Sequence, residues 1–312
     1  WMGAIEQLNR DLPTPGRAGA GRLFFLINRS SGDKSGDRTA GQIRARFGPD
    51  ADIHVMSEGE DLAAVVADAI AKGAETVVAA GGDGTVCGVA AAILGTGWRM
   101  AVLPCGTFNF FARSPDIPLE REAALEVLAT GRPRPVSLGQ VNDRVFINNA
   151  SLGAYALILN EREQVYRRWG RSRLAAYWSV LVAMVTVYRP LTMRITIDGQ
   201  IVRAKSPMAF IGISAHQLDE YAIEGADAIR SGKFAVLLAP DSGRYMLIWR
   251  ALKIALRGIR RGRDFTLLTG RDILIETRRS HRLVARDGER ERMQGPYRFR
   301  ILDDAIEVFR PR

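Results

Sequence analysis

The stretch Thr76-Val77-Val78-Ala79-Ala80-Gly81-Gly82-Asp83-Gly84-Thr85 decides how this 312-residue chain folds. Its first five residues form an apolar run typical of a buried strand, and the next segment, Val86–Leu94, favours a helix. A buried strand that leads through glycines into a helix is a common phosphate-binding arrangement. Glycine lets the backbone approach the anion, and the unpaired amides at the helix start point toward it. The stretch therefore predicts a phosphate site at the carboxyl end of a strand.

Asp83 is the unusual member of this stretch. A carboxylate among phosphate-binding amides repels the ligand unless a cation lies between them, so the turn predicts Mg²⁺ together with a nucleotide. The alternative is a tight turn in which Asp83 only caps the following helix.

Strands and helices alternate around this stretch from Arg22 to about Pro135. The rhythm predicts an α/β domain with a parallel sheet and helices on both faces. Ligands bind at the carboxyl ends of strands in such folds, so we expect Asn28, Gly81–Thr85 and Cys105–Asn109 to converge on one crevice. The expected strands are Arg22–Asn28, Asp52–Met56, Glu75–Ala80 and Met100–Leu103, and the expected helices are Gly36–Phe47, Asp61–Ala71, Val86–Leu94 and Leu119–Thr130.

Beyond Val136 the pattern changes to short alternating strands separated by turn signals such as Asp198-Gly199 and Asp287-Gly288. This pattern predicts a mainly antiparallel β domain, either a sandwich or a barrel-like pair of sheets. The expected strands are Val145–Asn149, Met193–Asp198, Ile201–Ala204, Ala209–Ile213, Phe234–Leu238, Phe265–Leu268, Ile273–Thr277, Leu283–Arg286, Tyr297–Ile301 and Ala305–Phe309.

The expected organisation is a loose tail over residues 1–21, an α/β domain over 22–135 and a β domain over 136–312. The last strand of the β domain is a candidate to return to the first domain. No apolar run reaches the eighteen or so residues that a membrane span needs.

The net charge of +10 and the pI near 10.1 indicate an acidic partner, either nucleic acid, an anionic membrane surface or a polyanionic substrate. The few aromatic residues do not interleave with basic ones, which argues against nucleic acid. Two cysteines favour a reduced, cytosolic protein. The three histidines lack zinc spacing and no Gly-x-Ser-x-Gly motif occurs, so zinc and serine hydrolase chemistry are disfavoured.

Two helical insertions interrupt the predicted β domain. Arg244–Arg263 has one apolar face and one basic face and contains no acidic residue, a composition typical of a helix lying on an anionic bilayer. Glu161–Tyr188 begins with arginines and continues into an apolar run with aromatic residues. For each, a helix that packs on the core is the alternative.

Four motifs together resemble the diacylglycerol kinase catalytic family, which includes bacterial lipid kinases, sphingosine kinases and ceramide kinases. The family pattern is Asn-Pro-x-Ser-Gly, Gly-Gly-Asp-Gly-Thr, Pro-x-Gly-Thr-x-Asn-Asp and a late Asp-Gly-Glu. This chain is similar at Asn28–Gly32, Gly81–Thr85, Pro104–Asn109 and Asp287-Gly288-Glu289, in the same order between Arg22 and Pro311. NAD kinases share the Gly-Gly-Asp-Gly-Thr element, and the late Asp-Gly-Glu in a β domain favours the lipid kinases.

The resemblance implies two domains with ATP and Mg²⁺ in the cleft, Asp83 at the nucleotide–metal site and Glu289 as general base for the incoming hydroxyl. The residues alone also allow Asp287-Gly288 to be a plain surface hairpin. The residues expected to contact the nucleotide are Asn28, Ser31, Gly32, Ser57, Gly81, Gly82, Gly84, Thr85, Thr107 and Asn109.

Two positions depart from the family pattern. Phe110 replaces the Asp that follows Asn109, which removes a carboxylate often near the metal or substrate. Asp227–Phe234 resembles a segment that holds a structural magnesium through an Asp-Gly pair, but this chain has Ser231-Gly232 instead. We therefore expect the second metal site to be lost and the Asp83–Glu289 chemistry to be kept.

The leading hypothesis is an ATP-dependent kinase of a two-chain membrane lipid, such as diacylglycerol or ceramide, that docks on the cytosolic face of a membrane through its basic helices. One alternative is a soluble kinase of the NAD kinase type, which leaves the basic segments unexplained. The other is a lipid-sensing pseudokinase that binds ATP without turnover, which Phe110 motivates.

Overall fold

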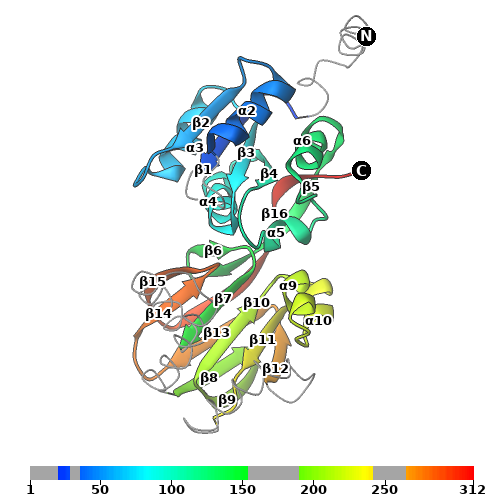
Figure 1. Cartoon of the computed structure of the whole chain (residues 1–312). Helices are drawn as coiled ribbons and strands as arrows, with labels where there is room; N and C mark the ends of the chain where they lie inside the picture. Colours follow the sequence, from blue (N-terminus) through cyan, green and yellow to red (C-terminus); the bar gives the residue numbers. More distant parts are fainter. Residues whose placement is uncertain (1–19, 29–35, 154–189, 242–264) are drawn as a thin grey trace, which may run out of the picture. The chain divides into compact units, whose positions relative to one another are not determined.

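The computed structural model describes residues 20–28, 36–153, 190–241 and 265–312, which form two compact units (Figure 1). The first unit runs to Ser137 and includes Asp303–Arg312, and the second comprises Leu138–Leu302. The sequence predicts a domain boundary after Pro135. Both expected helical insertions and all but the end of the expected N-terminal tail lie outside the described residues.

The first unit is built on a parallel sheet with the strand order β2-β1-β3-β4-β16. Every residue of β3 is buried, because helices cover both faces of the sheet. The end of β16 joins this sheet where Val308 pairs with Met100 of β4. The strands are β1 (Leu23–Asn28), β2 (Asp52–Met56), β3 (Thr76–Gly81), β4 (Arg99–Pro104) and the C-terminal part of β16 (Tyr297–Arg310).

Two pairs of helices enclose this sheet. α2 (Gly36–Phe47) and α6 (Arg121–Thr130) pack their apolar residues on one face, in a core that includes Phe25 and Leu103. α3 (Leu62–Ala71) and α4 (Asp83–Ile93) pack together on the other face. The predicted α/β class with a parallel sheet covered on both sides is thus confirmed.

The second unit consists of two antiparallel sheets whose inner faces share one core. In β8 the side chains alternate between buried Met193, Ile195 and Ile197 and more exposed polar residues, as expected for a strand with one face on the core. One sheet portion contains the start of β16, β13 (Asp272–Thr277), β8 (Leu191–Ile197) and β9 (Gln200–Ser206), with β5 (Arg132–Val141) and β6 (Arg144–Phe146) beside it. The six-stranded sheet contains β12 (Thr266–Gly270), β11 (Phe234–Leu238), β10 (Met208–Gly212), β7 (Asn149–Gly153), β14 (His281–Arg286) and β15 (Glu289–Gln294).

Two short helices, α9 (Ala215–Glu220) and α10 (Ala226–Arg230), cover part of the outer face of the six-stranded sheet. Leu218 and Ala226 pack there against Ala235 and Leu237 of β11. The predicted mainly antiparallel C-terminal domain is confirmed. No helix among the described residues is long and apolar enough to span a membrane.

Several expected elements differ from the structure. The helix expected over Val86–Leu94 begins three residues earlier, at Asp83, because Gly82 serves as its N-cap in an extended conformation. The strand expected over Val145–Asn149 is two strands, β6 and β7, since the chain turns at Ile147–Asn148. Tyr297–Ile301 and Ala305–Phe309 are not two strands but the single strand β16.

The reason for the last error is the pair Asp303-Asp304, which resembles a turn because aspartate is depleted in strands. In β16 Asp304 instead has a positive φ of 46° within a continuous strand, and its amide donates to Ser137 Oγ at 3.3 Å. The charged strand β15, the proline-containing strand β5 and the short helices α5 (Phe110–Arg113), α9 and α10 lack a periodic apolar pattern, and none of them is predicted.

Candidate functional site

The three loops expected to form the site lie at one edge of the first sheet. The adjacent parallel strands β1, β3 and β4 end at Asn28, Gly81 and Pro104. Asn28 Nδ2 donates a hydrogen bond to Thr85 Oγ1 at 3.0 Å, and the amide of Cys105 donates to the carbonyl of Gly81 at 2.9 Å. The structure therefore brings the three loops together.

The glycine-rich turn leaves room for a ligand at one position and none at another. A Cβ on Gly81 would lie 2.4 Å from Thr85 Oγ1, so the side chain of Thr85, which is buried, fills that space. At exposed Gly84 a Cβ would meet no described atom within 4 Å. Gly84 lies in the first turn of α4, where backbone amides lack partners within the helix. An anion can approach the backbone here.

Asp83 holds a neighbouring loop. Its Oδ2 accepts the amide N–H of Phe110 at 3.2 Å and its Oδ1 accepts that of Phe111 at 2.9 Å, at the start of α5. The alternative expectation is that Asp83 only caps the helix that follows it. In the structure Gly82 is the N-cap of α4, and the Asp83 carboxylate caps α5. Each carboxylate oxygen has two lone pairs, so an oxygen that accepts a backbone amide can also bind a cation.

The loop after β4 packs directly against this turn. Asn109, with a φ of 50°, closes a ring with Gly106 in which each residue donates one hydrogen bond to the other at 2.9 Å. A Cβ on Gly106 would lie 2.5 Å from the Cα of Gly82. The two loops can touch because Gly82 and Gly106 have no side chains. Thr107, which lies between Gly106 and Asn109, is exposed.

Phe110 contributes packing and a backbone amide rather than a carboxylate. Its ring is buried and stacks on Phe108, with centroids 5.4 Å apart and an angle of 4° between the planes. Its amide is one of the two that Asp83 accepts. Phe110 therefore lacks the carboxylate of the family pattern, but its backbone amide still orients Asp83.

The other residues of the first unit that are predicted to contact the nucleotide follow β1 and β2 in the sequence. Ser57 follows β2 at the same edge of the sheet, and its amide donates to Glu60 Oε2 at 2.9 Å. This bond, together with the one from His54 at 2.9 Å, lowers the pKa of the Glu60 carboxyl. Ser31 and Gly32 lie outside the described residues.

Glu289 lies in the second unit, immediately after a two-residue turn. Asp287 and Gly288 both have positive φ, 46° and 91°, and Arg286 pairs with Glu289 across the hairpin. The side chain of Glu289 is exposed and makes no hydrogen bond or ion pair with a described residue. Two residues further on, Glu291 binds Arg144 and Arg286 at 3.1 and 3.2 Å.

Asp287 has a role that the sequence analysis missed. Its carboxylate accepts the backbone amides of Ile147, Asn148 and Asn149 at 2.7, 2.8 and 3.1 Å. The hairpin that carries Glu289 is thereby tied to the segment between β6 and β7. A hairpin aspartate is normally explained by its turn, so the sequence contains no separate signal for this contact.

The segment expected to have lost a structural metal forms α10 and the turn after it. Asp227 pairs with Arg230 at 2.9 Å, and Ser231 Oγ donates to the carbonyl of Ala228 at 2.7 Å. Across the described part of the chain, no three His, Cys, Asp or Glu side chains gather in a way that could hold a metal ion.

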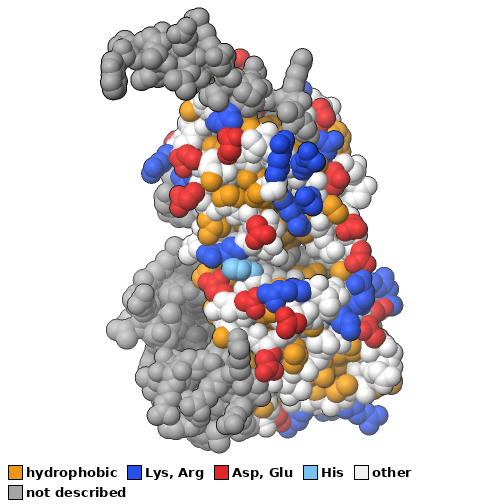
Figure 2. All heavy atoms as spheres, turned by 90° about the vertical axis from the view of Figure 1, so that its right-hand side faces the viewer, with side chains coloured by type: hydrophobic (Ala, Val, Ile, Leu, Met, Phe, Trp, Pro, Cys, Tyr) orange, Lys and Arg blue, Asp and Glu red, His pale blue; other side chains and the backbone are white. Residues whose placement is uncertain are grey.

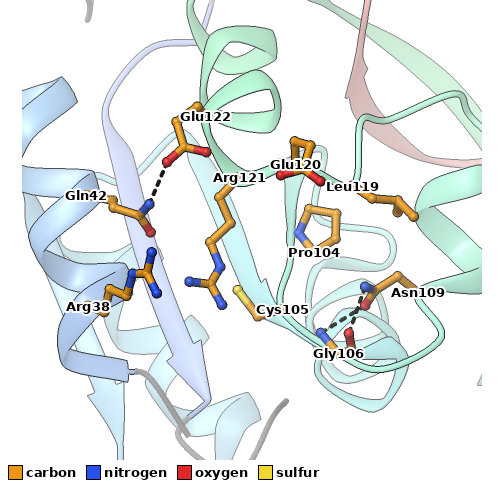
Figure 3. A pocket seen from close by; sticks show the side chains of 10 residues that line it. All are labelled: Arg38, Gln42, Pro104, Cys105, Gly106, Asn109, Leu119, Glu120, Arg121 and Glu122. Atoms are coloured by element: carbon orange, nitrogen blue, oxygen red, sulfur yellow. Dashed lines mark hydrogen bonds between the residues drawn. The ribbon is translucent and has the colours of Figure 1, made fainter. Parts of the chain in front are cut away.

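A pocket of about 420 Å³ lies on the α2 and α6 side of the β4 loop (Figure 3). Arg38 and Gln42 enter it from α2, and Arg121 enters from the first turn of α6. Its lining is Arg38, Gln42, Pro104, Cys105, Gly106, Asn109, Leu119, Glu120, Arg121 and Glu122. Cys105 and Cys87 are not joined in a disulfide.

Charge on the described surface is mixed. On the face in Figure 2 the basic side chains form several small groups, each with carboxylates nearby. The expectation of an acidic partner, drawn from the net charge of +10, therefore stays a prediction.

Residues 22–141 match the family model of the diacylglycerol kinase catalytic domain. They belong to the diacylglycerol kinase catalytic-domain family. The family match ends before β7, so Asp83 lies inside it and Glu289 lies outside it.

Relatives of known sequence agree with this family. The chain is 35% identical over 136 residues to "Probable lipid kinase YegS-like" of Cronobacter sakazakii, which covers 42% of this chain and 46% of that protein. It is 42% identical over 133 residues to the protein of the same name in Pseudomonas aeruginosa, covering 42% and 43%. A "Diacylglycerol kinase" of Mycobacterium tuberculosis is 28% identical over 188 residues, covering 57% and 60%. The chain thus spans less than half the length of the two YegS-like relatives.

Among solved structures, a diacylglycerol kinase from Bacillus anthracis superposes with a TM-score of 0.68 at 19% identity, covering 93% of this chain and 96% of that one. At this identity the likeness shows the fold alone. It extends over both units and supports the same fold for the second unit, which the family match does not reach.

Proposed function

We propose that this chain is an ATP-dependent lipid kinase that transfers the γ-phosphate to a primary hydroxyl of a two-chain membrane lipid, of the diacylglycerol or ceramide type. The observation that carries the proposal is the carboxylate of Asp83 beside the open backbone of Gly84 at the edge of a parallel sheet. The family of residues 22–141 supports a lipid as the acceptor.

The first unit supplies the parts that phosphoryl transfer needs on the nucleotide side. The amides of the first turn of α4 and the open face of Gly84 suit a phosphate chain, and Asn28 and Thr85 fix the turn from the neighbouring strand. We propose that Ser57, Thr107 and Asn109 add polar contacts from the adjacent strand ends.

The donor set at this edge fits magnesium that arrives with the nucleotide. Mg²⁺ in phosphoryl-transfer enzymes commonly keeps several waters and takes one or two carboxylates plus phosphate oxygens from the protein and substrate. Asp83 is such a carboxylate, and its amide partners hold it in place before any ligand binds. When bound, the ion neutralises charge on the transferring phosphoryl group.

Glu289 is the proposed general base. A base must accept the proton of the attacking hydroxyl, and a carboxylate already engaged by arginines is poorly suited to do so. Glu289 makes no ion pair with a described residue, whereas Glu291 on the same strand has two arginine partners. Asp287 would fix the hairpin that presents this carboxylate.

We propose that the chain binds the cytosolic face of a membrane that contains anionic lipid. The segments that would bind it are Arg244–Arg263 and Glu161–Tyr188. A kinase of an insoluble lipid must reach its substrate where the lipid resides. Replacing Lys253, Arg257 and Arg260 by Gln should then weaken binding to vesicles that contain anionic lipid, and unchanged binding would refute this role.

One assay tests the function. The protein is incubated with γ-labelled ATP, Mg²⁺ and mixed micelles that contain diacylglycerol, ceramide or no acceptor, with NAD in a parallel reaction. Label in an extracted lipid supports the proposal, and the micelle that yields it gives the acceptor class. Label in NAD would overturn it in favour of an NAD kinase type enzyme, and ATP binding without label in any acceptor would favour a pseudokinase.

A further inference from the structure

We infer that the ring of Phe108, stacked on Phe110, contacts the apolar part of the acceptor lipid close to the hydroxyl that is phosphorylated. The inference rests on the proposed function and adds to it a residue that determines acceptor specificity. Phe110, on which the ring stacks, stands where the family pattern has an aspartate. The departure at this position would then replace a carboxylate by part of an apolar contact.

Phe108 exposes an aromatic ring that the surrounding loop holds in place. The residue is 48% exposed, and its ring stacks on buried Phe110 with the centroids 5.4 Å apart. Its carbonyl accepts a hydrogen bond from Arg113 Nε at 3.3 Å, and Asn109 beside it exchanges two hydrogen bonds with Gly106. The ring is therefore a fixed apolar surface of the folded loop.

Exposed large apolar side chains are few among the described residues. The list is Phe108, Leu119, Ile201 and Tyr221. Phe108 and Leu119 both lie on the connection between β4 and α6, and Figure 3 shows Leu119 on the same side of the pocket as Asn109. Single apolar residues are normal on a protein surface, but two on one connection of a proposed active site favour a ligand with an apolar part.

The ring lies next to the carboxylate proposed to meet Mg²⁺. Asp83 Oδ2 accepts the backbone N–H of Phe110 at 3.2 Å, and Phe110 supplies the ring on which Phe108 stacks. Mg²⁺ bridges the β- and γ-phosphates in phosphoryl transfer. The apolar surface would therefore lie beside the phosphoryl group that is transferred.

The strand order indicates which substrate reaches this surface. In the order β2-β1-β3-β4, the ends of β1 and β2 lie on one side of the glycine-rich turn and the β4 loop lies on the other. The proposed nucleotide contacts at β1 and β2, Asn28 and Ser57, are polar. The attacking and leaving oxygens of phosphoryl transfer lie roughly in line, so the acceptor approaches from the side opposite the rest of the nucleotide. A nucleotide that extends over β1 and β2 leaves Phe108 to the acceptor, and Thr107 and Asn109 then contact the terminal phosphate.

The test compares the acceptor and nucleotide kinetics of Phe108→Ala with those of the parent protein. The acceptor is the lipid that takes up label, and its KM is measured as a mole fraction in neutral detergent micelles at constant micelle concentration. Association with the micelle surface is then the same throughout. Phe108→Ala should raise the KM for the lipid by about tenfold and leave kcat and the KM for ATP with Mg²⁺ unchanged.

Two further variants separate this contact from a general effect on the fold. Phe108→Leu keeps most of the apolar surface and should recover most of the lost affinity for the lipid. Ile201→Ala removes a side chain that is 54% exposed on β9, and it should leave both KM values unchanged. Circular dichroism melting checks that each variant is folded.

The failure of this inference differs from the failure of the proposed function. The inference alone is overturned if the parent protein phosphorylates a lipid and Phe108→Ala has the same KM for it. A rise in the KM for ATP without a rise in that for the lipid would also overturn it, and would assign the ring to the nucleotide base. Absence of label in every lipid with the parent protein would overturn the proposed function, and the inference with it.

Discussion

Asp83 accepts the backbone N–H of Phe111 at 2.9 Å, so the carboxylate in the first turn of α4 also caps the start of α5. The residue proposed to meet magnesium is therefore oriented by the protein before the nucleotide binds. Loss of the Asp83 charge should therefore change both the unfolding free energy and the affinity for ATP with Mg²⁺. The two quantities can be measured separately.

We expect Asp83→Asn to abolish the dependence of ATP affinity on Mg²⁺. The Asn side chain keeps one acceptor oxygen for one amide, so the unfolding free energy should fall by only about 1–2 kcal/mol. ATP affinity is measured by calorimetry with Mg²⁺ and with EDTA, beside a denaturant titration. A variant whose ATP affinity still rises with Mg²⁺ as in the parent protein would remove Asp83 from the metal site.

Glu289→Gln should lower the rate of lipid phosphorylation by about 10²-fold or more while ATP affinity and thermal stability stay unchanged. The matched control is Glu291→Gln on the same strand, whose carboxylate binds Arg144 and Arg286. The control should lose about 1 kcal/mol of stability and keep its turnover per folded molecule. Equal rate losses in the two variants would contradict a specific role for Glu289.

Gly84→Ala tests whether the open space at Gly84 is needed for ATP binding and not for folding. A Cβ at Gly84 meets no described atom, so the fold should accept it and gain up to about 1 kcal/mol of helix stability. The methyl group would occupy the space through which a phosphate approaches the backbone, so ATP affinity should fall. Gly41→Ala, on α2 with equally open surroundings, should be stabilised without any change in ATP affinity. Unaltered ATP binding by Gly84→Ala would place the phosphates elsewhere.

Acid should destabilise the second unit through Asp198. Its carboxylate accepts the amides of Asp272 at 2.9 Å and Arg271 at 3.0 Å, and these bonds, led by that of Asp272, hold its pKa below the usual range despite an opposing effect of burial. A lowered pKa means that the stabilisation is present at neutral pH and is lost as the pH falls through the folded-state value, below about pH 4.

The measurement is the unfolding free energy as a function of pH for Asp198→Asn and the parent protein. The difference should be largest at neutral pH and disappear in acid, because asparagine tolerates the positive φ of 46° at this position but lacks the charge. Asp143→Asn, at an aspartate that is 80% exposed, serves as control. A difference between parent and Asp198→Asn that does not vary with pH would show that the carboxylate charge is not its source.

The sequence was sufficient where local pattern and tertiary environment agree. The apolar run before Gly81 is buried on both sides in the structure, and its glycines locate the turn that follows. The strand over Phe234–Leu238 is predicted with its observed bounds, since a short run of apolar residues next to Gly232 leaves little choice. The turns Asp198-Gly199 and Asp287-Gly288 have the positive φ values that their residue types predict.

Prediction failed where a contact distant in sequence decides the local structure. Phe110–Arg113 becomes a helical turn because Asp83, 27 residues earlier, caps it. The chain turns at Ile147–Asn148 because Asp287 accepts amides from 140 residues away. The arginines that enter the α2 and α6 pocket lie on two helices whose contact no local pattern reveals. Such tertiary hydrogen bonds leave no periodic trace in a single sequence.

The return of β16 to the first sheet has a consequence for how the protein is made. Phe309 lies in the core of the first unit, and Val308 pairs with Met100 of β4, yet the whole of residues 138–302 must be synthesised between the two strands. While the ribosome is still translating the second unit, the edge of β4 lacks its partner strand. The nascent first unit therefore exposes an unpaired parallel edge during most of translation, and its folding can finish only after residues 303–312 have left the exit tunnel.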